Sequence, residues 1–567
     1  MKLNLYPLFI TVLLATCFLP ACEPEQIVIT ADEEDEPDDG LGAYSFASDD
    51  TDMTDLDNIG ASTFDRWITV EFKDGGQATV SEQGDSVSVG IGGNHVTVTN
   101  SSGDRIVYEL RGTASNGSFK LYSSRKQVIF LNGVRLTNPS GAAINNQSHK
   151  RTFVVVTGEN SLKDGSTYAS TAGEDQKAAF FSEGQLVFSG AGSLTVTALG
   201  KGGITSDNYV RFMSAPTVSV SSSAGHGIRG KDGVTVSNGT LTVTVSADTK
   251  KGISSDANVR FEGGLTAITV TGSAAYDSED KTYSGSAGVK ADKDLLFTGG
   301  ALTVTNSGTG GKGISVDGKA VFSGGTVEVS ASGANYTSGD ISAKAIKVDG
   351  AIEFSGATVS ATAVSHEAIE SKSTIKISAG DVYAFSQKDD AINSASTFTI
   401  TGGIVTGISL GNDGLDANGD FDISGGVVFA AGARSPEVAI DANTEQRYKL
   451  TLTGGTIFAI GGLEGGSTLS QSCYQASSWS PSTWYTMTIG SSVYSFYTPE
   501  SGGSGLVVSG SSEPTLVKGS SVSGAASHAA GHILEGGTVS GGSSVSLAAY
   551  TASSSGGGPG GGGGRPW

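Results

Sequence analysis

The sequence predicts an all-β protein folded as a parallel β-helix, a solenoid with N- and C-terminal caps. The first observation is a pattern written twice, over 389–403 and 412–426, with each matched position 23 residues from its partner. The second is the alternation inside each copy, as in Phe398 and Ile400, which is typical of a strand with one buried face. The third is composition, because 83 glycines and many β-branched residues favour strands and sharp bends over helices.

The repeat extends far beyond this pair through apolar anchor positions. The anchors are Ile204, Ile228, Ile253, Val289, Ile314, Ile346, Ile369, Ile392, Leu415 and Ile440. Most gaps between anchors are 23 to 25 residues, and two are longer, at 36 and 32 residues. A unit of this size cannot bury its own apolar face, so it must stack on a neighbour. Ten coils at about 4.8 Å each predict a rod about 48 Å long before its caps.

Residues 1–22 are predicted to be a targeting segment outside the fold. An apolar run ends in Leu19-Pro20-Ala21-Cys22, which resembles a bacterial lipoprotein signal with Cys22 as the lipidated residue. The alternative is an ordinary secretory signal cleaved near Ala21. We therefore expect a lipid-anchored protein of the outer membrane, displayed at the cell surface, with no other contact with the membrane.

Residues 23–65 hold 15 acidic residues and no lysine or arginine, which predicts a disordered tether. This stretch resembles the surface-export signals of Bacteroidetes lipoproteins; the alternative is a solubilising spacer. It carries most of the net charge of −22 and leaves the folded body only mildly acidic. A nucleic-acid partner would need a basic face, so we expect none, and we expect a monomer.

The remaining chain divides by the regularity of its repeat. Residues 66–165 are predicted to form the N-terminal cap and first coils, and 166–460 the regular coils. From 461 to 550 the pattern decays into glycine, serine and scattered aromatic residues, which we interpret as a C-terminal cap. Residues 551–567 form a Gly-rich tail that we expect to be flexible.

An ordered series of motifs links the chain to a known family. The series runs from Leu131-Asn132-Gly133-Val134 through Asn160-x-Leu162-x-Asp164-Gly165 to His226-Gly227-Ile228-Arg229. Together these motifs resemble the bacterial carbohydrate-binding domain-containing parallel β-helix family over roughly residues 80 to 520. The resemblance implies a right-handed parallel β-helix similar in shape to pectate lyases. It also implies calcium ions in the coils and binding of acidic or cellulosic plant polysaccharides without established catalysis.

The turn over 411–420 is the strongest metal candidate in the sequence. It places Asp413, Asp416 and Asp420 among glycines, and stacking could add Asp390 from the preceding coil. Calcium takes six to eight oxygen ligands, often from carboxylates in a flexible turn. The turn Asp413-Gly414-Leu415-Asp416 also keeps the form that the family uses. The alternative is a solvated turn in which Asp and Asn serve the bend alone.

A second set of carboxylates lies three residues after successive anchors. Its members are Asp207, Asp256, Asp292, Asp317 and Asp349. Stacking should bring neighbours in this column to about 5 Å, where carboxylates raise one another's pKa or recruit a cation. We favour the alternative that recurring lysines such as Lys293, Lys319 and Lys344 neutralise them.

Three insertions, over 164–177, 272–286 and 331–344, are predicted to emerge on one edge of the rod. They carry Tyr168, Tyr276, Tyr283 and Tyr336, whose flat rings with polar tips suit stacking on sugars. By anchor count, Tyr276 and Tyr336 are about 10 Å apart, which predicts an aromatic row along the rod. The alternative is that these tyrosines only pack on the rod.

The hypothesis that follows is a non-catalytic surface lipoprotein that binds polysaccharide, a plant cell-wall-type or acidic glycan. A polysaccharide lyase or hydrolase is the second hypothesis, and it needs a tight cluster of lysine or arginine with carboxylates on one face. A structural adhesin is the third. No catalytic residues are assigned, because no nucleophile and base motif is recognisable.

Overall fold

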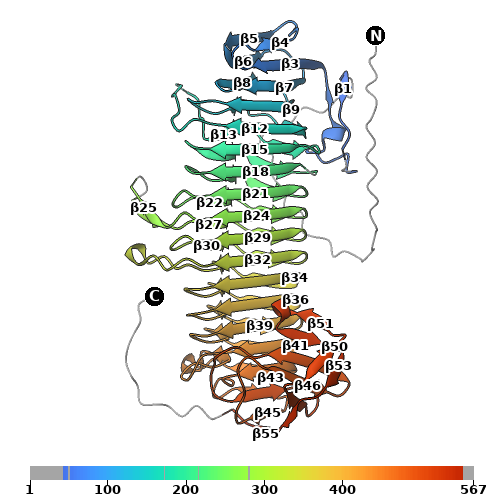
Figure 1. Cartoon of the computed structure of the whole chain (residues 1–567), viewed down its shortest axis with the longest axis vertical. Coiled ribbons are helices and arrows are strands. Elements are labelled where there is room, and N and C mark those ends of the chain that lie inside the picture. The colour runs from blue at the N-terminus through green and yellow to red at the C-terminus, as the bar shows by residue number, and fades with distance from the viewer. Residues whose placement is uncertain (1–41, 49–50, 172, 215, 279–280, 553–567) are drawn as a thin grey trace.

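The computed structural model describes residues 42–48, 51–171, 173–214, 216–278 and 281–552, and they form a long stack of β-coils (Figure 1). One sheet of 15 strands runs the length of the stack. In chain order, its strands are β5 (Val87–Gly92), β6 (Asn94–Asn100), β8 (Gly117–Ser123), β10 (Ile144–Asn146), β13 (Ala178–Ser182), β16 (Gly202–Ser206), β19 (Ile228–Gly230), β22 (Lys251–Ser255), β27 (Ala287–Ala291), β30 (Lys312–Val316), β33 (Ile346–Val348), β35 (Ile369–Ser371), β37 (Ile392–Ser394), β40 (Leu415–Ala417) and β42 (Ile440–Ala442).

Successive anchors occupy the same register position in this sheet. Ile204 pairs with Ile228, Ile228 with Ile253, and the series continues in parallel pairs to Leu415 with Ile440. The two long gaps before Val289 and Ile346 do not break the series, because their extra residues leave the stack as loops. The prediction of an all-β parallel β-helix is therefore confirmed, anchor by anchor.

Each regular coil adds two further strands to the wall of the solenoid. One column contains β14 (Leu186–Ser189), β17 (Tyr209–Phe212), β20 (Gly233–Val236), β23 (Val259–Phe261), β28 (Leu295–Phe297), β31 (Ala320–Phe322) and β38 (Phe398–Ile400). The next contains β12 (Glu159–Lys163), β15 (Ser193–Ala198), β18 (Thr217–Ser222), β21 (Thr240–Val245), β24 (Leu265–Val270), β29 (Ala301–Asn306), β32 (Thr326–Ala331) and β39 (Ile404–Ser409). In later coils the two strands merge into β34 (Ile352–Ala363), β36 (Ile375–Ser386), β41 (Phe421–Ala431) and β43 (Leu450–Ile460).

The interior is filled by the inward residues of all three columns in one continuous apolar core. Phenylalanine rings stack from coil to coil, as for Phe398 and Phe421, whose centroids are 4.4 Å apart. A glycine precedes the anchor in several coils because the opposite wall approaches closely there. At Gly252, for example, a Cβ atom would overlap the Ile268 side chain and the Gly288 carbonyl oxygen. The narrow cross-section of the rod therefore depends on these positions.

The insertions leave the stack on one side, as predicted, and they are seen at the left of Figure 1. The insertion before Val289 contains an antiparallel hairpin, β25 (Ala275–Asp277) with β26 (Thr282–Ser284). The insertion before Ile346 contains a short 3-10 turn, η2 (Thr337–Gly339). These loops form one edge of an otherwise uniform rod.

The described part of the acidic stretch, residues 42–48 and 51–65, differs from the expected disordered tether. Its strand β1 (Tyr44–Ser45) pairs with β2 (Thr63–Phe64), and Phe64 is buried against the first coils. The carboxylate of Asp57 accepts hydrogen bonds from Arg151 Nε (2.8 Å) and the Tyr209 hydroxyl (2.6 Å). The acidic residues here are counterparts of basic groups on the rod, which charge content alone could not reveal.

The first coils lead into the stack from an N-terminal pair of hairpins. The strand β3 (Arg66–Lys73) pairs antiparallel with β4 (Thr79–Val80), and β5 pairs antiparallel with β6. Parallel stacking then proceeds through β7 (Ile106–Ala114), β9 (Gln127–Thr137) and β11 (Thr152–Thr157). Parallel coil stacking therefore already begins within residues 66–165.

The C-terminal residues form antiparallel sheets against the last coils. The strands β44 (Thr468–Leu469), β45 (Cys473–Ala476), β48 (Leu506–Ser509) and β55 (Ala548–Tyr550) extend from β43. A six-stranded sheet contains, in spatial order, β51 (Ala526–His528), β52 (Ile533–Glu535), β47 (Ser492–Tyr497), β46 (Trp484–Ile489), β49 (Thr515–Lys518) and β54 (Ser543–Val545).

This sheet, which we call the C-terminal sheet, packs on the outer side of the last coils (Figure 1, lower right). Phe429 and Phe458, on the outer face of the coils, share a second apolar core with Tyr485 and Phe496. The rings of Phe458 and Phe496 stack with their centroids 4.5 Å apart. The last coils are therefore buried on both faces of their wall, unlike the middle of the rod.

Candidate functional site

Three of the four predicted tyrosines meet at the loop edge. Tyr276 and Tyr283 face each other across the β25–β26 hairpin, with ring centroids 5.1 Å apart. Tyr336, from the next insertion, lies 6.0 Å from Tyr283. Tyr276 is 52% exposed and Tyr283 is 41% exposed, which is unusual for aromatic rings in the described part of this chain. We call these three residues the tyrosine cluster.

The geometry of the tyrosine cluster differs from the expected row. The rings of Tyr276 and Tyr283 are inclined by 63°, and those of Tyr283 and Tyr336 by 50°. Tyr283 fills the space between the two rings that were expected to be about 10 Å apart by coil spacing. The cluster therefore presents ring faces in different directions and suits a local contact with one or two sugar rings.

Tyr168 lies away from this cluster. Its hydroxyl donates to the Asp164 carboxylate (2.8 Å), and the Lys201 ammonium lies 5.9 Å from its ring centroid. Its insertion precedes Phe180, four coils before Val289, which is about 19 Å along the rod. Tyr168 packs on the rod, which is the alternative that the sequence left open for all four tyrosines.

Two buried amines lie at the base of the tyrosine cluster. Lys251 Nζ donates to the Ser284 hydroxyl (3.2 Å), one residue from Tyr283, and to the Thr249 carbonyl (2.6 Å). Lys312 occupies the same column, separated from Lys251 by Ala287. Burial, and then nearby lysines, lower the pKa of each to about 8. Within the described chain, neither amine forms an ion pair, so this edge offers uncompensated positive charge.

The same column changes sign further along the rod. Lys312 and Lys344 lie two residues before their anchors, as do Glu367, Asp390 and Asp413 in the following coils. At the change of sign, Lys344 Nζ lies 3.0 Å from Glu367 and 2.5 Å from Glu370, and all three side chains are buried. These carboxylates hold the pKa of Lys344 above its usual range despite its burial.

His366 adds a second ion pair to this junction. Its Nδ1 contacts Glu367 and lies 2.9 Å from Asp389. Although burial opposes the charged ring, these partners raise the pKa of His366 to about 9. Oxygen and nitrogen ligand atoms of His366, Glu367 and Asp389 lie within 4.8 Å of one another. The junction is a compact cluster of lysine, histidine and carboxylates, the kind that the enzyme hypothesis requires.

The predicted calcium turn lies directly beyond this junction. The Asn393 amide donates to Asp390 and to Asp416, at 3.0 Å each. The Asp413 N–H donates to Asp390 Oδ1 (3.0 Å), and Asp413 Oδ1 accepts the Val438 N–H (2.6 Å). Asp441 pairs in register with Asp416 on the next strand. We call Asp390, Asp413, Asp416 and Asp441 the acidic ladder.

The ladder is a concentration of buried negative charge. Burial is the main cause that raises the pKa of Asp413 and of Asp416 to about 7, and of Asp441 to about 10. Burial, and then Asp416, raise the pKa of Asp390. In the described residues, no lysine or arginine pairs with any of the four carboxylates. A cation would relieve their mutual repulsion, and a ladder of carboxylate oxygens fits the ligand preference of calcium.

Asp420 is not brought into the ladder. It lies five residues after its anchor and is exposed, and its carboxylate accepts the Lys449 N–H (2.9 Å). The stacked Asp207 to Asp349 column is neutralised by basic groups, as we favoured, but by different ones. Arg229 pairs with Asp256 (2.8 Å), and Lys290 pairs with both Asp292 and Asp317. Lys347 pairs with Asp349, and Lys177 pairs with Asp207.

Comparison with known proteins gives this geometry a family. A family model described as "Carbohydrate-binding domain-containing protein" matches residues 92–414, more than half of the chain. The chain belongs to this family. The match includes the tyrosine cluster, the two amines, the junction and part of the acidic ladder, and it ends before the C-terminal sheet. Carbohydrate is therefore the class of ligand with which the family is associated.

Other comparisons add less. A solved structure titled "Structure of the polysaccharide lyase-like protein from C. thermocellum, Gadolinium derivative" is 22% identical, with a TM-score of 0.31, and covers 46% of this chain and 93% of that chain. No curated protein matches the chain. Cys22 lies outside the described residues, so its lipidation stays a prediction. In the part that is described, no helix is long and apolar enough to cross a membrane.

Proposed function

We propose that this protein is a non-catalytic surface lipoprotein that binds an acidic polysaccharide at the loop edge of its solenoid. The observation that carries the proposal is the exposed tyrosine cluster, built from two insertions of a chain in a carbohydrate-binding family. Apolar aromatic faces stack on the C–H faces of sugar rings, while the hydroxyls of Tyr276 and Tyr283 remain free to exchange hydrogen bonds with sugar hydroxyls.

The positive charge at the base of the cluster supports an anionic sugar. Lys251 and Lys312 are buried amines without carboxylate partners among the described residues. A carboxylate or sulfate on the glycan would form a charge-assisted hydrogen bond there, which is shorter and stronger than a neutral one. Because burial holds their pKa near 8, bound anionic sugar should also keep both amines protonated.

Calcium is part of the proposal as a structural ion. The acidic ladder is chemically suited to it, because its donors are carboxylate oxygens. Bound calcium would compensate the repulsion among Asp390, Asp413, Asp416 and Asp441 in the coils beyond the tyrosine cluster. In this role the ion stiffens the rod, and the sugar contacts remain with the loop edge.

The test measures the affinity for polygalacturonate and for cello-oligosaccharides by isothermal titration calorimetry. The triple variant Tyr276→Ala, Tyr283→Ala, Tyr336→Ala should lose at least tenfold in affinity. Stacking contacts are worth about 0.5–1.5 kcal/mol each, and about 1.4 kcal/mol corresponds to a factor of ten. Lys251→Met with Lys312→Met should weaken binding of polygalacturonate and leave binding of the neutral oligosaccharide unchanged.

Tyr448→Ala is the matched control, because Tyr448 is 40% exposed on a different loop. It should bind as the parent does, and all variants should keep the parent's thermal midpoint. Unchanged affinity in the triple variant contradicts the proposal. An equal loss in the Tyr448 variant would show that any exposed tyrosine matters, and would contradict the assignment of the site.

A lyase is the second candidate, favoured by one observation. Lys312, with a pKa lowered to about 8, is partly neutral just above neutral pH and lies one coil from the charged junction. A neutral amine can accept the proton next to a uronate carboxylate. Lys344 and His366 cannot, since their partners keep them protonated. Appearance of ultraviolet absorbance from an unsaturated uronate product, lost in Lys312→Met, would replace the binding proposal by this one.

A further inference from the structure

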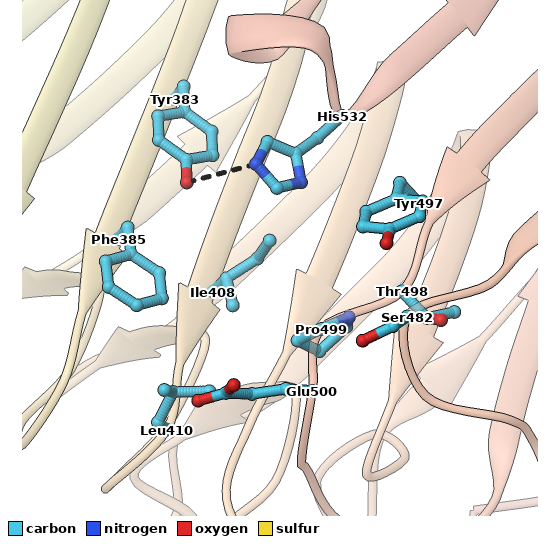
Figure 2. Close-up of a pocket in the computed structure, with 10 residues that line it drawn as sticks. All are labelled: Tyr383, Phe385, Ile408, Leu410, Ser482, Tyr497, Thr498, Pro499, Glu500 and His532. Carbon is cyan, nitrogen blue, oxygen red and sulfur yellow. Dashed lines mark hydrogen bonds between the residues drawn. The ribbon is translucent and has the colours of Figure 1, made fainter.

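A cavity of about 260 Å³ lies where the C-terminal sheet meets the side of the solenoid (Figure 2). On the solenoid side it is lined by Tyr383 and Phe385 of β36 and by Leu410 after β39. The facing wall includes Tyr497 and His532. This place lies beyond the loop edge and uses residues 482–532, which are outside the matched range 92–414. Neither the family match nor the proposed function gives it a role.

The walls of the cavity are held in place by contacts that do not need a ligand. The His532 ring stacks on the Tyr383 ring, with centroids 5.1 Å apart and planes inclined by 13°. The Tyr383 hydroxyl lies 3.4 Å from His532 Nε2. The backbone N–H of Ala529 donates to both carboxylate oxygens of Asp381, at 3.1 and 3.0 Å, which fixes the segment before His532 against β36. The cavity is therefore preformed.

The lining combines flat apolar faces with a few polar atoms at the rim. Figure 2 shows the rings of Tyr383, Phe385, Tyr497 and His532 around the space, with Glu500 near Leu410. Such a lining suits a ligand with an apolar face and hydroxyl groups along its edge, which is the chemistry of a pyranose ring. An entirely apolar ligand would leave the Glu500 carboxylate and the tyrosine hydroxyls without partners at the rim.

The charge of the lining selects against anions. Glu500 is the only charged side chain among the described residues that line the cavity. Burial lowers the pKa of His532, so its ring is neutral near pH 7. A carboxylate can accept hydrogen bonds from two neighbouring hydroxyls of a sugar, whereas it repels a uronate. The preference for a neutral ligand is opposite to that of the loop edge, where Lys251 and Lys312 supply positive charge.

The size of the cavity limits the ligand to a single ring. A volume of about 260 Å³ corresponds to roughly nine water molecules at about 30 Å³ each. It is smaller than the pockets of about 300–1,000 Å³ that hold drug-sized ligands. Since the cavity is partly open to solvent, the rest of a chain could continue outward from the bound ring.

We infer that the cavity between β36, β39 and the C-terminal sheet binds one terminal ring of a neutral glycan, stacked among Tyr383, Tyr497 and His532 and hydrogen-bonded to Glu500. The inference shares with the proposed function only the class of ligand. It places a second binding site on the opposite part of the chain, with the opposite charge preference. One polysaccharide with acidic segments and neutral ends could occupy both sites.

The experiment uses the full chain and four small probes: methyl β-D-glucopyranoside, methyl β-D-galactopyranoside, D-galacturonate and phenol. Saturation-transfer NMR detects binding, and titration of the same signals gives Kd. Leu410→Trp adds bulk at the mouth of the cavity from a half-buried position, and Glu500→Gln removes the charge from an exposed position. Neither change touches the apolar core, so both variants should fold, which the thermal midpoint checks.

At least one neutral glycoside should bind saturably, and Leu410→Trp should weaken it at least tenfold. Glu500→Gln should reduce the discrimination against D-galacturonate severalfold. The triple tyrosine variant of the loop edge should bind the neutral glycoside as the parent does, so failure of one site is distinguishable from failure of the other. The inference is overturned if neither glycoside binds, if Leu410→Trp binds equally well, or if D-galacturonate or phenol binds more tightly than both glycosides.

Discussion

Asp413→Asn should stabilise the protein in the absence of calcium, and the gain should depend on pH. Asp413 is only 8% exposed, and burial raises its pKa from 3.8 to about 7. A carboxyl group whose pKa is raised by folding binds its proton more tightly in the native state. Its contribution to the free energy of unfolding therefore falls as pH rises from about 4 to about 7, and stays low above that.

The magnitude follows from the size of this rise. From 3.8 to about 7, at about 1.36 kcal/mol per pKa unit, the cost of ionised Asp413 at pH 8 is about 4 kcal/mol. Asparagine keeps an oxygen that can accept the Val438 N–H and carries no charge. In chelator at pH 8, Asp413→Asn should therefore unfold at a higher temperature than the parent. At pH 4, where Asp413 is protonated, the two midpoints should coincide.

Calcium should reverse the order of the two proteins. An ion that binds only the native parent adds about 2.7 kcal/mol at one hundred times its Kd, while the variant has lost one ligand. Differential scanning calorimetry at pH 4 and pH 8, with calcium and with chelator, gives the four comparisons. Asp420→Asn is the control, since Asp420 is exposed and lies outside the ladder. The reasoning is refuted if Asp413→Asn is less stable than the parent in chelator at pH 8.

Three further outcomes are expected. Lys344→Met should lower the free energy of unfolding by about 3–5 kcal/mol in chemical denaturation, because it leaves Glu370 buried without its closest cation; pairing it with Glu370→Gln should restore part of the loss, and no restoration would argue against a charge effect. Gly252→Ala should lower the thermal midpoint, since the added Cβ meets the Ile268 side chain inside the coil; an unchanged midpoint would show that the coil can widen. Cys22→Ala should move the protein from the membrane fraction to the soluble fraction, and a variant that stays with the membrane would exclude lipidation at Cys22 as the anchor.

The regular part of the fold could be predicted because it is written locally. Each anchor is followed about 24 residues later by its own stacking partner, so Ile369, Ile392 and Leu415 specified both their strands and their register. Earlier members of the same sheet, Phe119 and Phe180, were not recognised as anchors. Their spacing is irregular, and Phe replaces the aliphatic residues of the later coils.

The contacts between coils were harder to predict, because they depend on the register of side chains outside the anchors. Lys293 and Lys319 were chosen as partners of the aspartate column for their closeness in sequence. The structure instead uses Lys290, one residue after its anchor, where stacking places it beside Asp317. The C-terminal sheet was beyond sequence reasoning for a related reason. Its strands pair over long and uneven separations, with no repeat to mark the partners.

The stack of coils reverses direction at its N-terminal edge, and this has a consequence for assembly. A bare parallel edge would present a row of unpaired backbone groups to the edge of another rod. Here β4 and β5 fold back antiparallel on β3 and β6, so the first coils do not end in a free parallel template. Removing residues 1–100 would expose the edge of the next coil. We expect such a truncated chain to join end to end into filaments, with the same spacing of about 4.8 Å between strands that holds each rod together.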